Sequence, residues 1–397
     1  MPQLTLQRLG VVMEPEPGNP QEIEGVLNPA AIRGRDGHLY LFPRLVGPGN
    51  YSRIGIARVR FDSDGNPAGV ERLGIALEPE ADYERRPEGG GCEDPRITYV
   101  EPLQRYLMTY TAHSPLGPRI ALASSEDLFH WERLGLATFE SYHGIDFMQV
   151  DNKDATVFPV AIPNHAGKLQ LGLLHRPLFP GTRPGEWTHQ RAELSDLTPA
   201  QHMMHGVGRP HESIWISYCP IPSASVTPQQ LGMFNSHHRL AAPAAAWERF
   251  KIGGGTPPML TRHGWLLFYH GVERLAQAHS DGRQLRYSAG VMILAKDHPH
   301  HLRYRSPEPV LFPILPQERQ GMIANVVFPT GIDRRDDLGA PERFDIYYGM
   351  ADSRIGVARL DLPAVLPVQR VADPTQAARA LRRPLDAGRQ PILGQRQ

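Results

Sequence analysis

One pattern recurs five times along this chain, and it limits the fold more than any other feature. Each copy has a short apolar segment, a polar turn, an aromatic-rich segment, a connection, and a segment of small residues. Such short segments, bounded by glycine and proline, are typical of β-strands. Five imperfect copies of one strand-rich unit predict a repeat architecture. The strands expected in the five copies are 28–32, 38–44 and 53–57; 93–100, 105–111 and 119–123; 153–159, 168–176 and 213–217; 255–260, 264–271 and 288–292; and 325–329, 344–349 and 354–358.

The content of the copies favours one arrangement of these strands. Helical repeats need a 3.6-residue apolar period, which is missing here, and parallel solenoids use shorter and more regular units. Two β-sandwiches in tandem would not give matched segments in all five copies. Small sheets placed radially around an axis cover each other's faces and leave only short edges. We therefore expect an all-β fold, a five-bladed β-propeller.

The repeats also set the expected boundaries of the domain. Residues 1–27 are rich in proline and are expected to be an extended N-terminal lead-in. Residues 28–362 form the expected propeller. Residues 363–397 are expected to hold a short C-terminal helix, starting at Asp373, and a tail.

Two stretches fall outside the repeats. Residues 178–212 form a long insertion of loop or helical character, with a short capped helix expected near Ser195. Residues 220–247 form a second excursion, rich in proline and alanine. A long insertion in a compact domain is a candidate lid, or a candidate contact in a homo-oligomer.

Composition excludes several classes of partner. Lys plus Arg and Asp plus Glu number 42 each, so no net field attracts nucleic acid or an anionic membrane. No apolar run is long enough to span a membrane, and residues 1–10 lack the pattern of a signal peptide. The two cysteines, Cys92 and Cys219, do not make a disulfide framework. We expect a cytoplasmic protein that acts on a small molecule.

Polar residues stand at the start of each copy. In a propeller the innermost strand of each blade lines the central axis, so the starts of the five copies converge. A pocket there would hold carboxylates, one lysine and neutral hydrogen-bonding groups, which suits a polar small molecule. The converging residues are Asn28, Glu93, Asp94, Lys153, Asp154, Thr256 and Asn325.

The second copy begins with an acidic motif that follows three glycines. A carboxylate at the mouth of a strand, here Asp94, suits proton transfer, and Arg96 supplies a nearby fixed cation. The alternative is an ordinary turn, in which Asp94 caps local amides and Arg96 pairs with Glu93. Both interpretations stay open at this stage.

Basic and hydroxyl side chains recur at matched places in the copies. Lys153 starts the third copy, and Arg176 ends its second strand; Tyr269, followed by His270, ends the second strand of the fourth copy, and Arg44 that of the first. Arg53 opens the next strand of the first copy. Gathered on one rim, they predict an anion site of phosphate size. Singly, the arginines could instead pair with neighbouring carboxylates, and Tyr269 could be a half-buried strand residue.

The eighteen histidines do not have the spacing of a metal site. His202, His205 and His211 lie in the insertion, and His298, His300 and His301 form a turn, without an acidic partner on a clear helix. No phosphate-binding glycine loop, nucleophile elbow or dinucleotide fingerprint is present. We expect neither a metal nor a cofactor.

Taken together and in order, the motifs resemble glycoside hydrolase family 130, the mannoside phosphorylases, whose members are five-bladed β-propellers. They cover residues 28 to 360 and comprise Glu93-Asp94-Pro95-Arg96, Lys153-Asp154-Ala155 with Phe158-Pro159, His175-Arg176-Pro177, Gly255-Thr256-Pro257-Pro258 with Gly264-Trp265-Leu266, Tyr269-His270-Gly271, and Tyr348-Gly349-Met350-Ala351-Asp352.

The resemblance implies an inverting phosphorylase. Such an enzyme cleaves a β-mannoside, for example mannosyl-glucose or a β-manno-oligosaccharide, with inorganic phosphate to give α-mannose 1-phosphate. Asp94 would be the general acid, passing its proton through a sugar hydroxyl. The expected phosphate-binding residues are Lys153, Arg176, Tyr269 and Arg53. The expected substrate-binding residues are Asn28, Arg44, Glu93, Asp154, His270 and Asp352.

Two other functions fit the same sequence. A β-mannosidase would use water, with a second carboxylate such as Glu93 or Asp154 as its base. A non-catalytic propeller would bind a glycan or a protein at its axis. Phosphate already is a nucleophile and needs cations to hold it, so one acid beside a basic set favours the phosphorylase.

Overall fold

The computed structural model describes residues 4–86, 89–142, 146–178, 212–221, 231–275 and 285–367. Within them the chain is all-β, apart from the one-turn helix α2 (Pro316–Arg319) and short 3₁₀ turns. No helix in these ranges is long and apolar enough to cross a membrane. The C-terminal helix expected from Asp373, the helix expected near Ser195 and nearly all of the 178–212 insertion lie outside the described residues.

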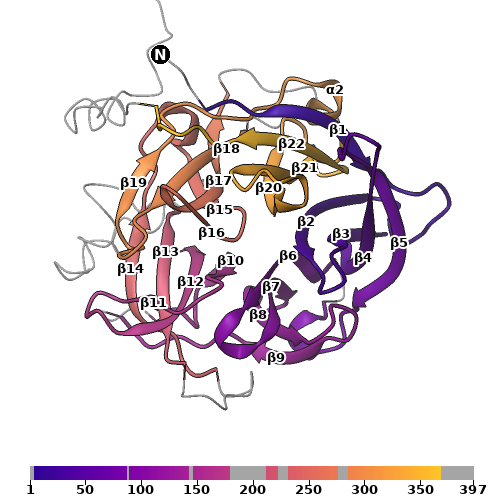
Figure 1. Ribbon diagram of the computed structural model, residues 1–397. Helices are drawn as coiled ribbons and strands as arrows, with labels where there is room; N and C mark the ends of the chain where they lie inside the picture. Colours follow the sequence, from indigo (N-terminus) through magenta and orange to yellow (C-terminus); the bar gives the residue numbers. More distant parts are fainter. Residues whose placement is uncertain are drawn as a thin grey trace, which may run out of the picture.

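The strands group into five units in chain order (Figure 1). The first is β2 (Gly25–Arg33), β3 (Leu39–Gly47), β4 (Tyr51–Phe61) and β5 (Pro67–Leu77); the second is β6 (Gly90–Val100), β7 (Arg105–Ser114), β8 (Gly117–Ser125) and β9 (Glu132–Leu136); the third is β10 (Asp151–Val157), β11 (Ile162–Pro163), β12 (Leu169–Leu178), β13 (Ile214–Cys219) and β14 (Asn235–Ala241). The fourth is β15 (Lys251–Gly254), β16 (Met259–Thr261), β17 (Gly264–Arg274), β18 (Leu285–Leu294) and β19 (Leu302–Arg305); the fifth is β20 (Val327–Arg334), β21 (Arg343–Met350), β22 (Arg354–Asp361) and β1 (Gln7–Met13).

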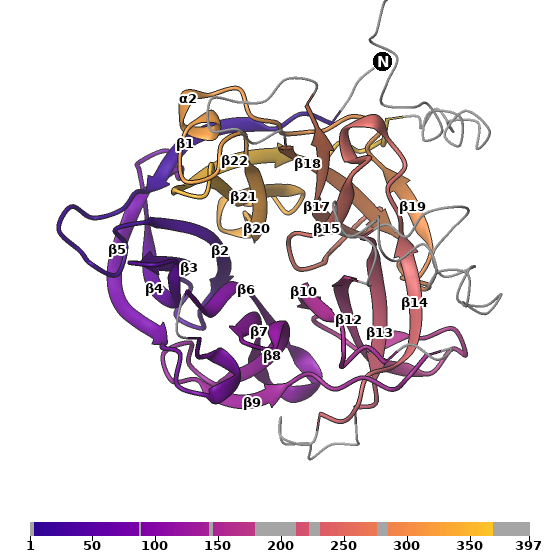
Figure 2. The same cartoon turned by 180° about the vertical axis from the view of Figure 1, so that it is seen from behind.

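Neighbouring strands within each unit are antiparallel. The first and second units belong to one eight-stranded sheet, because β4 and β6 share a short parallel pairing at Tyr51–Gly90 and Ser52–Gly91. The other three units are separate sheets. From both sides, the units follow one another around the molecule, with β2, β6, β10 and β20 toward its middle (Figures 1 and 2).

The hydrophobic core lies between the units rather than in one central mass. One cluster joins Phe42 and Ile54 of the first unit to Met108 of the second. Other clusters join the second unit to the third, the third to the fourth and the fourth to the fifth. A further cluster joins the fifth unit to the first, with Tyr347 and Val357 packed beside Leu41. Each sheet therefore buries its two faces against its two neighbours, which a single small sheet could not do.

Three segments differ from the sequence-based expectations. The stretch 1–27, expected to be a lead-in, contains β1, which pairs with β22 at the edge of the fifth unit. The excursion 220–247 contains β14, the outer strand of the third unit. The innermost strand of the fourth unit is Lys251–Gly254, so the inner strand expected at 255–260 was placed a few residues too late in the sequence. The end of that segment belongs to β16, which pairs with β17. These short strands do not alternate apolar and polar residues regularly, and such alternation is the pattern that identifies a strand in sequence.

Candidate active site

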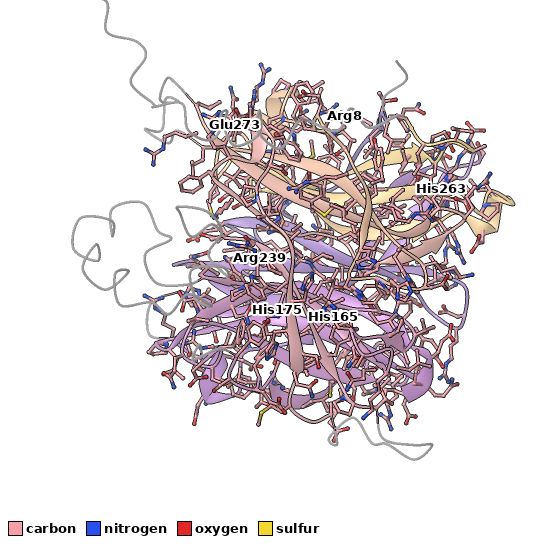
Figure 3. All side chains as sticks on the ribbon, turned by 90° about the vertical axis from the view of Figure 1, so that its left-hand side faces the viewer. Arg8, His165, His175, Arg239, His263 and Glu273 are labelled. Carbon is pink, nitrogen blue, oxygen red and sulfur yellow. The ribbon has the colours of Figure 1, made fainter. Side chains whose placement is uncertain are left out.

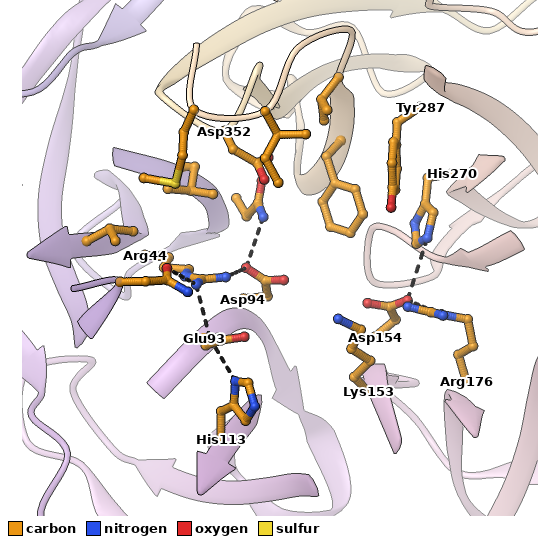
Figure 4. Close-up of a pocket in the computed structure, with 18 of the residues that line it drawn as sticks. Arg44, Glu93, Asp94, His113, Lys153, Asp154, Arg176, His270, Tyr287 and Asp352 are labelled. Atoms are coloured by element: carbon orange, nitrogen blue, oxygen red, sulfur yellow. Dashed lines mark hydrogen bonds and ion pairs between the residues drawn. The ribbon is translucent and has the colours of Figure 1, made fainter. Parts of the chain in front are cut away.

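A single pocket near the middle of the molecule collects most of the polar residues expected to converge (Figure 4). Its volume is about 460 Å³. The inner strands β2, β6 and β10 contribute one side, and Phe328 of β20 and the segment before it contribute another. The residues that line it are Leu27, Asn28, Arg44, Val46, Asn50, Glu93, Asp94, His113, Lys153, Asp154, Arg176, Lys251, His270, Tyr287, Met322, Ile323, Val326, Phe328 and Asp352.

Matched bulges in three inner strands point three of these residues at the pocket. The pairing register shifts between Leu27 and Ala30 in β2, between Glu93 and Arg96 in β6, and between Lys153 and Thr156 in β10. Asn28, Asp94 and Asp154 occupy the bulges with φ of 45°, 47° and 55°. Asn and Asp tolerate this left-handed conformation better than other residues with a side chain. A β-bulge re-aims a side chain, and here it does so in the inner strands of three units.

Asp94 is held from one side. Its Oδ1 accepts a hydrogen bond from Asn28 Nδ2 at 2.9 Å and lies 3.5 Å from Arg44 Nη1. The side chain is buried to 8% exposure, yet it lines the pocket. Because both donors approach Oδ1, the proton of a protonated Asp94 belongs on Oδ2. That geometry suits a general acid.

Glu93 stays ionised beside Asp94. Its Oε1 is 3.0 Å from Arg44 Nη2 and 3.4 Å from His113 Nδ1. Burial opposes its charge, but Arg44, the His113 hydrogen bond and Lys153 outweigh burial and lower the pKa of Glu93 to about 2. Glu93 is therefore a fixed anion that orients Arg44 rather than a proton donor near neutral pH.

Arg96 does not pair with Glu93, so the ordinary-turn interpretation of the acidic motif is wrong for this residue. Its Nη1 donates to the carbonyl of Asp94 at 2.6 Å, and its Nε donates to the carbonyl of Gly255 at 2.8 Å. The side chain is 1% exposed. Arg96 thus ties the bulge that carries Asp94 to the fourth unit.

Cations gather across the pocket from Asp94 (Figure 4). Arg176 Nε donates to Asp154 Oδ2 at 2.5 Å, and Lys251 Nζ lies 5.5 Å from the centre of the Tyr287 ring. Among the described residues, none forms an ion pair or hydrogen bond with Lys153. Its positive charge nevertheless stabilises the ionised forms of Glu93 and Asp154 through space. A lysine ammonium without a fixed partner is available to an anion entering the pocket.

Asp154 and His270 define the charge of this side. Burial opposes ionisation of Asp154, but the positive charges of Arg176 and Lys153 lower its pKa below the usual range. Burial lowers the pKa of His270 well below its ordinary value, so the ring is neutral at physiological pH. Within the described part of the chain neither ring nitrogen has a hydrogen-bond partner, and Nε2 lies 3.6 Å from Asp154 Oδ2. A neutral, unpaired imidazole can donate to a bound oxygen anion.

A buried chain of hydrogen bonds supports the strand that carries Lys153. His175 Nε2 and His237 Nδ1 both lie 2.7 Å from Ser217 Oγ, and His237 Nε2 lies 3.0 Å from the carbonyl of Glu140. His175 Nδ1 lies beside Asn152, the residue before Lys153. The third unit faces the viewer in Figure 3, where His175 is labelled.

Two glycines leave room for the site. A side chain on Gly349 of β21 would overlap Asn28 Oδ1, and one on Gly253 of β15 would overlap the Asp154 carboxylate and the His270 ring. Both glycines therefore matter because they leave space for these side chains. The sequence motifs around them did not predict this role.

Two of the expected phosphate-binding residues lie outside the pocket. Tyr269 is fully buried, and its hydroxyl donates to Glu248 Oε2 at 2.9 Å. In β17, Trp265, Leu267 and Tyr269 face the third unit, so His270, on the other face, reaches the pocket instead. Neighbouring residues of a strand point to opposite faces, so only His270 of this pair reaches the pocket. Arg53 forms an ion pair with Glu78, with Arg53 Nε 3.0 Å from Glu78 Oε1, and its guanidinium lies over the Tyr51 ring.

The other expected site residues line the pocket: Asn28, Arg44, Glu93, Asp94, Lys153, Asp154, Arg176, His270 and Asp352. Thr256 and Asn325, expected to converge with them, do not. Sequence reasoning missed Lys251 and Tyr287, which both line the pocket and lie next to each other, with Lys251 Nζ over the Tyr287 ring. Lys251 lies two residues before the glycine run 253–255, and only the position of the inner strand β15 shows that its side chain points into the pocket. In the described part of the chain, no three His, Cys, Asp or Glu side chains are grouped to hold a metal ion.

Comparison with known proteins identifies the family of this chain. A family model described as β-1,4-mannooligosaccharide phosphorylase matches residues 6–180 and 182–370. The chain belongs to glycoside hydrolase family 130. The family resemblance expected from the motifs is thereby confirmed, and the chain is an enzyme of the phosphorylase type.

Individual relatives match different shares of the chain. A 1,2-β-oligomannan phosphorylase from a Thermoanaerobacter species is 29% identical over 357 residues, which is 88% of this chain and 95% of that protein. A β-1,4-mannooligosaccharide phosphorylase from Ruminococcus albus is 38% identical over 125 residues, 32% of this chain and 35% of that protein. Among solved structures, a β-1,2-mannobiose phosphorylase from Listeria innocua, bound to β-1,2-mannobiose, is 20% identical with a TM-score of 0.62, covering 90% of this chain and 96% of that one. The structural likeness shows a shared fold.

Proposed function

We propose that this family member catalyses inverting phosphorolysis of a β-mannoside, with inorganic phosphate as its second substrate. The observation that carries the proposal is the division of one pocket into two sides. Asp94 lies on one side, and Lys153, Arg176 and neutral His270 lie across from it (Figure 4). Lys251 also lines the pocket, beside Tyr287. A sugar between them would have an acid near its leaving oxygen and a bound anion near the opposite face of its anomeric carbon.

The reaction then needs one displacement. A phosphate oxygen forms a bond to the anomeric carbon while the bond from that carbon to the leaving oxygen breaks. The proton of Asp94 reaches the leaving oxygen, through a sugar hydroxyl as the family resemblance implies. The products are α-mannose 1-phosphate and the released alcohol or sugar. Attack opposite the leaving group accounts for the inversion.

The charges of the pocket support phosphate over water as the nucleophile. A hydrolase needs a free carboxylate to deprotonate water. Glu93 and Asp154, the two carboxylates suggested for that task, have lowered pKa values and are engaged by Arg44 and Arg176. Strongly stabilised carboxylates are poor bases. A phosphate held by Lys153 and Lys251 needs no such base.

We also infer that the five units are the blades of a five-bladed β-propeller. Three observations support this architecture: inner strands that face one axis, core clusters between successive units, and a cluster that joins the last unit to the first. Strand β1, from the N-terminal end, completes the fifth unit beside β22. A first strand that pairs within the last unit holds a ring of sheets together.

The test is product analysis with a panel of β-mannosides, including β-1,2- and β-1,4-mannobiose and mannosyl-glucose, with and without phosphate. We expect mannose 1-phosphate with at least one member of the panel, and no turnover without phosphate. Free mannose formed at equal rates in both buffers would contradict the phosphate assignment and favour a β-mannosidase. No product from any mannoside would favour a glycan-binding protein.

A further inference from the structure

We infer that Glu212 is a positioning residue that fixes Arg176 and Lys251 as one anion-binding unit. This inference rests on the proposed phosphate site. Glu212 precedes β13 and does not itself line the pocket, and no sequence motif pointed to it. Its carbonyl accepts the N–H of Ile252 at 3.2 Å, so its backbone is tied to β15 of the next unit. The side chain is 7% exposed.

The Glu212 carboxylate lies between two cations from different units. Oε2 forms an ion pair with Arg176 Nη1 and lies 3.9 Å from Lys251 Nζ. Arg176 comes from β12 and Lys251 from β15, so no strand pairing sets their separation. The Glu212 carboxylate, which both cations contact, sets this separation instead.

Glu212 also sets the direction of the Arg176 guanidinium. Asp154 accepts from Nε, and Glu212 contacts Nη1. The flat guanidinium carries five N–H donors in a fixed fork, so anchoring two of its nitrogens leaves Nη2 as the group that can meet a ligand. None of the described residues accepts a hydrogen bond from Nη2.

The same contact makes the burial of Arg176 tolerable. Arg176 is 2% exposed, and an arginine buried without a partner is strongly destabilising. Asp154 supplies one anionic partner for the buried Arg176 guanidinium. Glu212 supplies the second, and because it sits behind Arg176 rather than in the pocket, it does not compete for the space that phosphate would fill.

The experiment compares Glu212→Ala and Glu212→Gln with wild type in phosphorolysis. We expect Glu212→Ala to raise the KM for phosphate by about ten-fold or more. This is the effect on affinity that the usual free energy of a hydrogen bond to a charged group predicts. We expect kcat at saturating phosphate and the KM for the mannoside to change less than about two-fold, because the Asp94 side is untouched. Glu212→Gln keeps an acceptor oxygen for Arg176 and restores most of the phosphate affinity.

Glu248 offers a matched control. It is a buried glutamate that pairs with Arg305 and accepts from Tyr269, and it does not line the pocket. Glu248→Ala is expected to lower the melting temperature without a selective rise in the KM for phosphate. If Glu212→Ala behaves like Glu248→Ala, its role is only structural and the inference is wrong.

A second measurement separates this inference from the proposed function. Inorganic phosphate that binds the folded protein raises its melting temperature with concentration. Phosphate stabilisation of wild type but a weakened response of Glu212→Ala supports the inference. An equal response of both would overturn the inference alone, while a wild type without any response would overturn the proposed phosphate site itself.

Discussion

Asn28 donates its Nδ2 hydrogen to Oδ1 of Asp94 at 2.9 Å, across two neighbouring inner strands. Both residues occupy bulges with left-handed φ, and both are nearly buried. Arg44 lies near the same oxygen. The pair leaves Asp94 Oδ2 to hold and release the proton, so the orientation of the proposed acid depends on a residue of the first unit.

Replacing Asp94 by Asn removes the transferable proton and keeps the shape of the side chain. We expect kcat to fall about 10²- to 10⁴-fold, the usual contribution of general acid catalysis. Phosphate binding, measured by its effect on the melting temperature, should remain near that of wild type. The exposed Asp361, which pairs with Arg343 far from the pocket, provides the control Asp361→Asn, which should keep full activity. Normal kcat in Asp94→Asn would exclude Asp94 as the acid.

Adding a methyl group at Gly349 tests the support of Asn28. The new Cβ overlaps Asn28 Oδ1, so Asn28 must move away from Asp94. We expect Gly349→Ala to lower kcat about ten-fold or more, as loss of a positioning contact commonly does, with a smaller change in the KM for phosphate. Gly232→Ala is the control, because nothing lies within 4 Å of its added Cβ. Unchanged kinetics in Gly349→Ala would mean that Asn28 does not orient Asp94.

Lys251 and Tyr269 give opposite predictions for phosphate. Lys251 lines the pocket, and its replacement by Ala should raise the KM for phosphate about ten-fold or more through loss of a charged contact. Tyr269→Phe removes a buried hydroxyl bonded to Glu248 and should cost about 1–3 kcal/mol of stability. Urea denaturation measures this loss of stability. Steady-state kinetics should show a KM for phosphate that matches wild type. A selective phosphate defect in Tyr269→Phe would restore the sequence-based assignment.

The lowered pKa of Glu93 predicts a specific acid sensitivity. Its pKa is about 2 in the folded protein and 4.5 ordinarily, so the folded state binds this proton less strongly than the unfolded chain. The stabilisation is therefore complete above about pH 4.5 and is lost as the pH falls toward 2; its size is about 3 kcal/mol at 1.4 kcal/mol per pKa unit.

Urea denaturation between pH 3 and 7 measures this effect. Glu93→Gln should be less stable than wild type near neutral pH and should lose less stability than wild type on acidification. The exposed Glu126 supplies the control Glu126→Gln, whose pH dependence should follow wild type. Parallel curves for wild type and Glu93→Gln would contradict the pKa assignment.

The sequence predicted the strand order and most of the pocket because both follow from short-range patterns. The matched strand starts predicted that Asn28, Asp94, Lys153 and Asp154 converge, and all four line the pocket. Asn28, Asp94 and Asp154 do so from equivalent bulges. Tyr269 lies outside the pocket because a strand reverses its faces with each residue, and its neighbour His270 is on the pocket side of β17.

The residues that sequence reasoning missed act between units. Lys251, Tyr287 and Glu212 come from the fourth unit or the start of β13, and their contacts with Arg176 and with one another join segments far apart in the chain. Gly349 and Asn28 meet across the first and fifth units in the same way. No local pattern encodes such distances, so only the packed structure reveals them.

The most direct test of the central claim is a proton and phosphorus NMR time course of the wild-type enzyme with β-1,2- or β-1,4-mannobiose, whichever it cleaves, in phosphate buffer. A single displacement by phosphate, assisted by Asp94, predicts the α anomer of mannose 1-phosphate as the first product, with one mannose released for each phosphate consumed. The β anomer would contradict a single inverting displacement. Two mannoses per disaccharide, without consumption of phosphate, would contradict phosphate as the nucleophile.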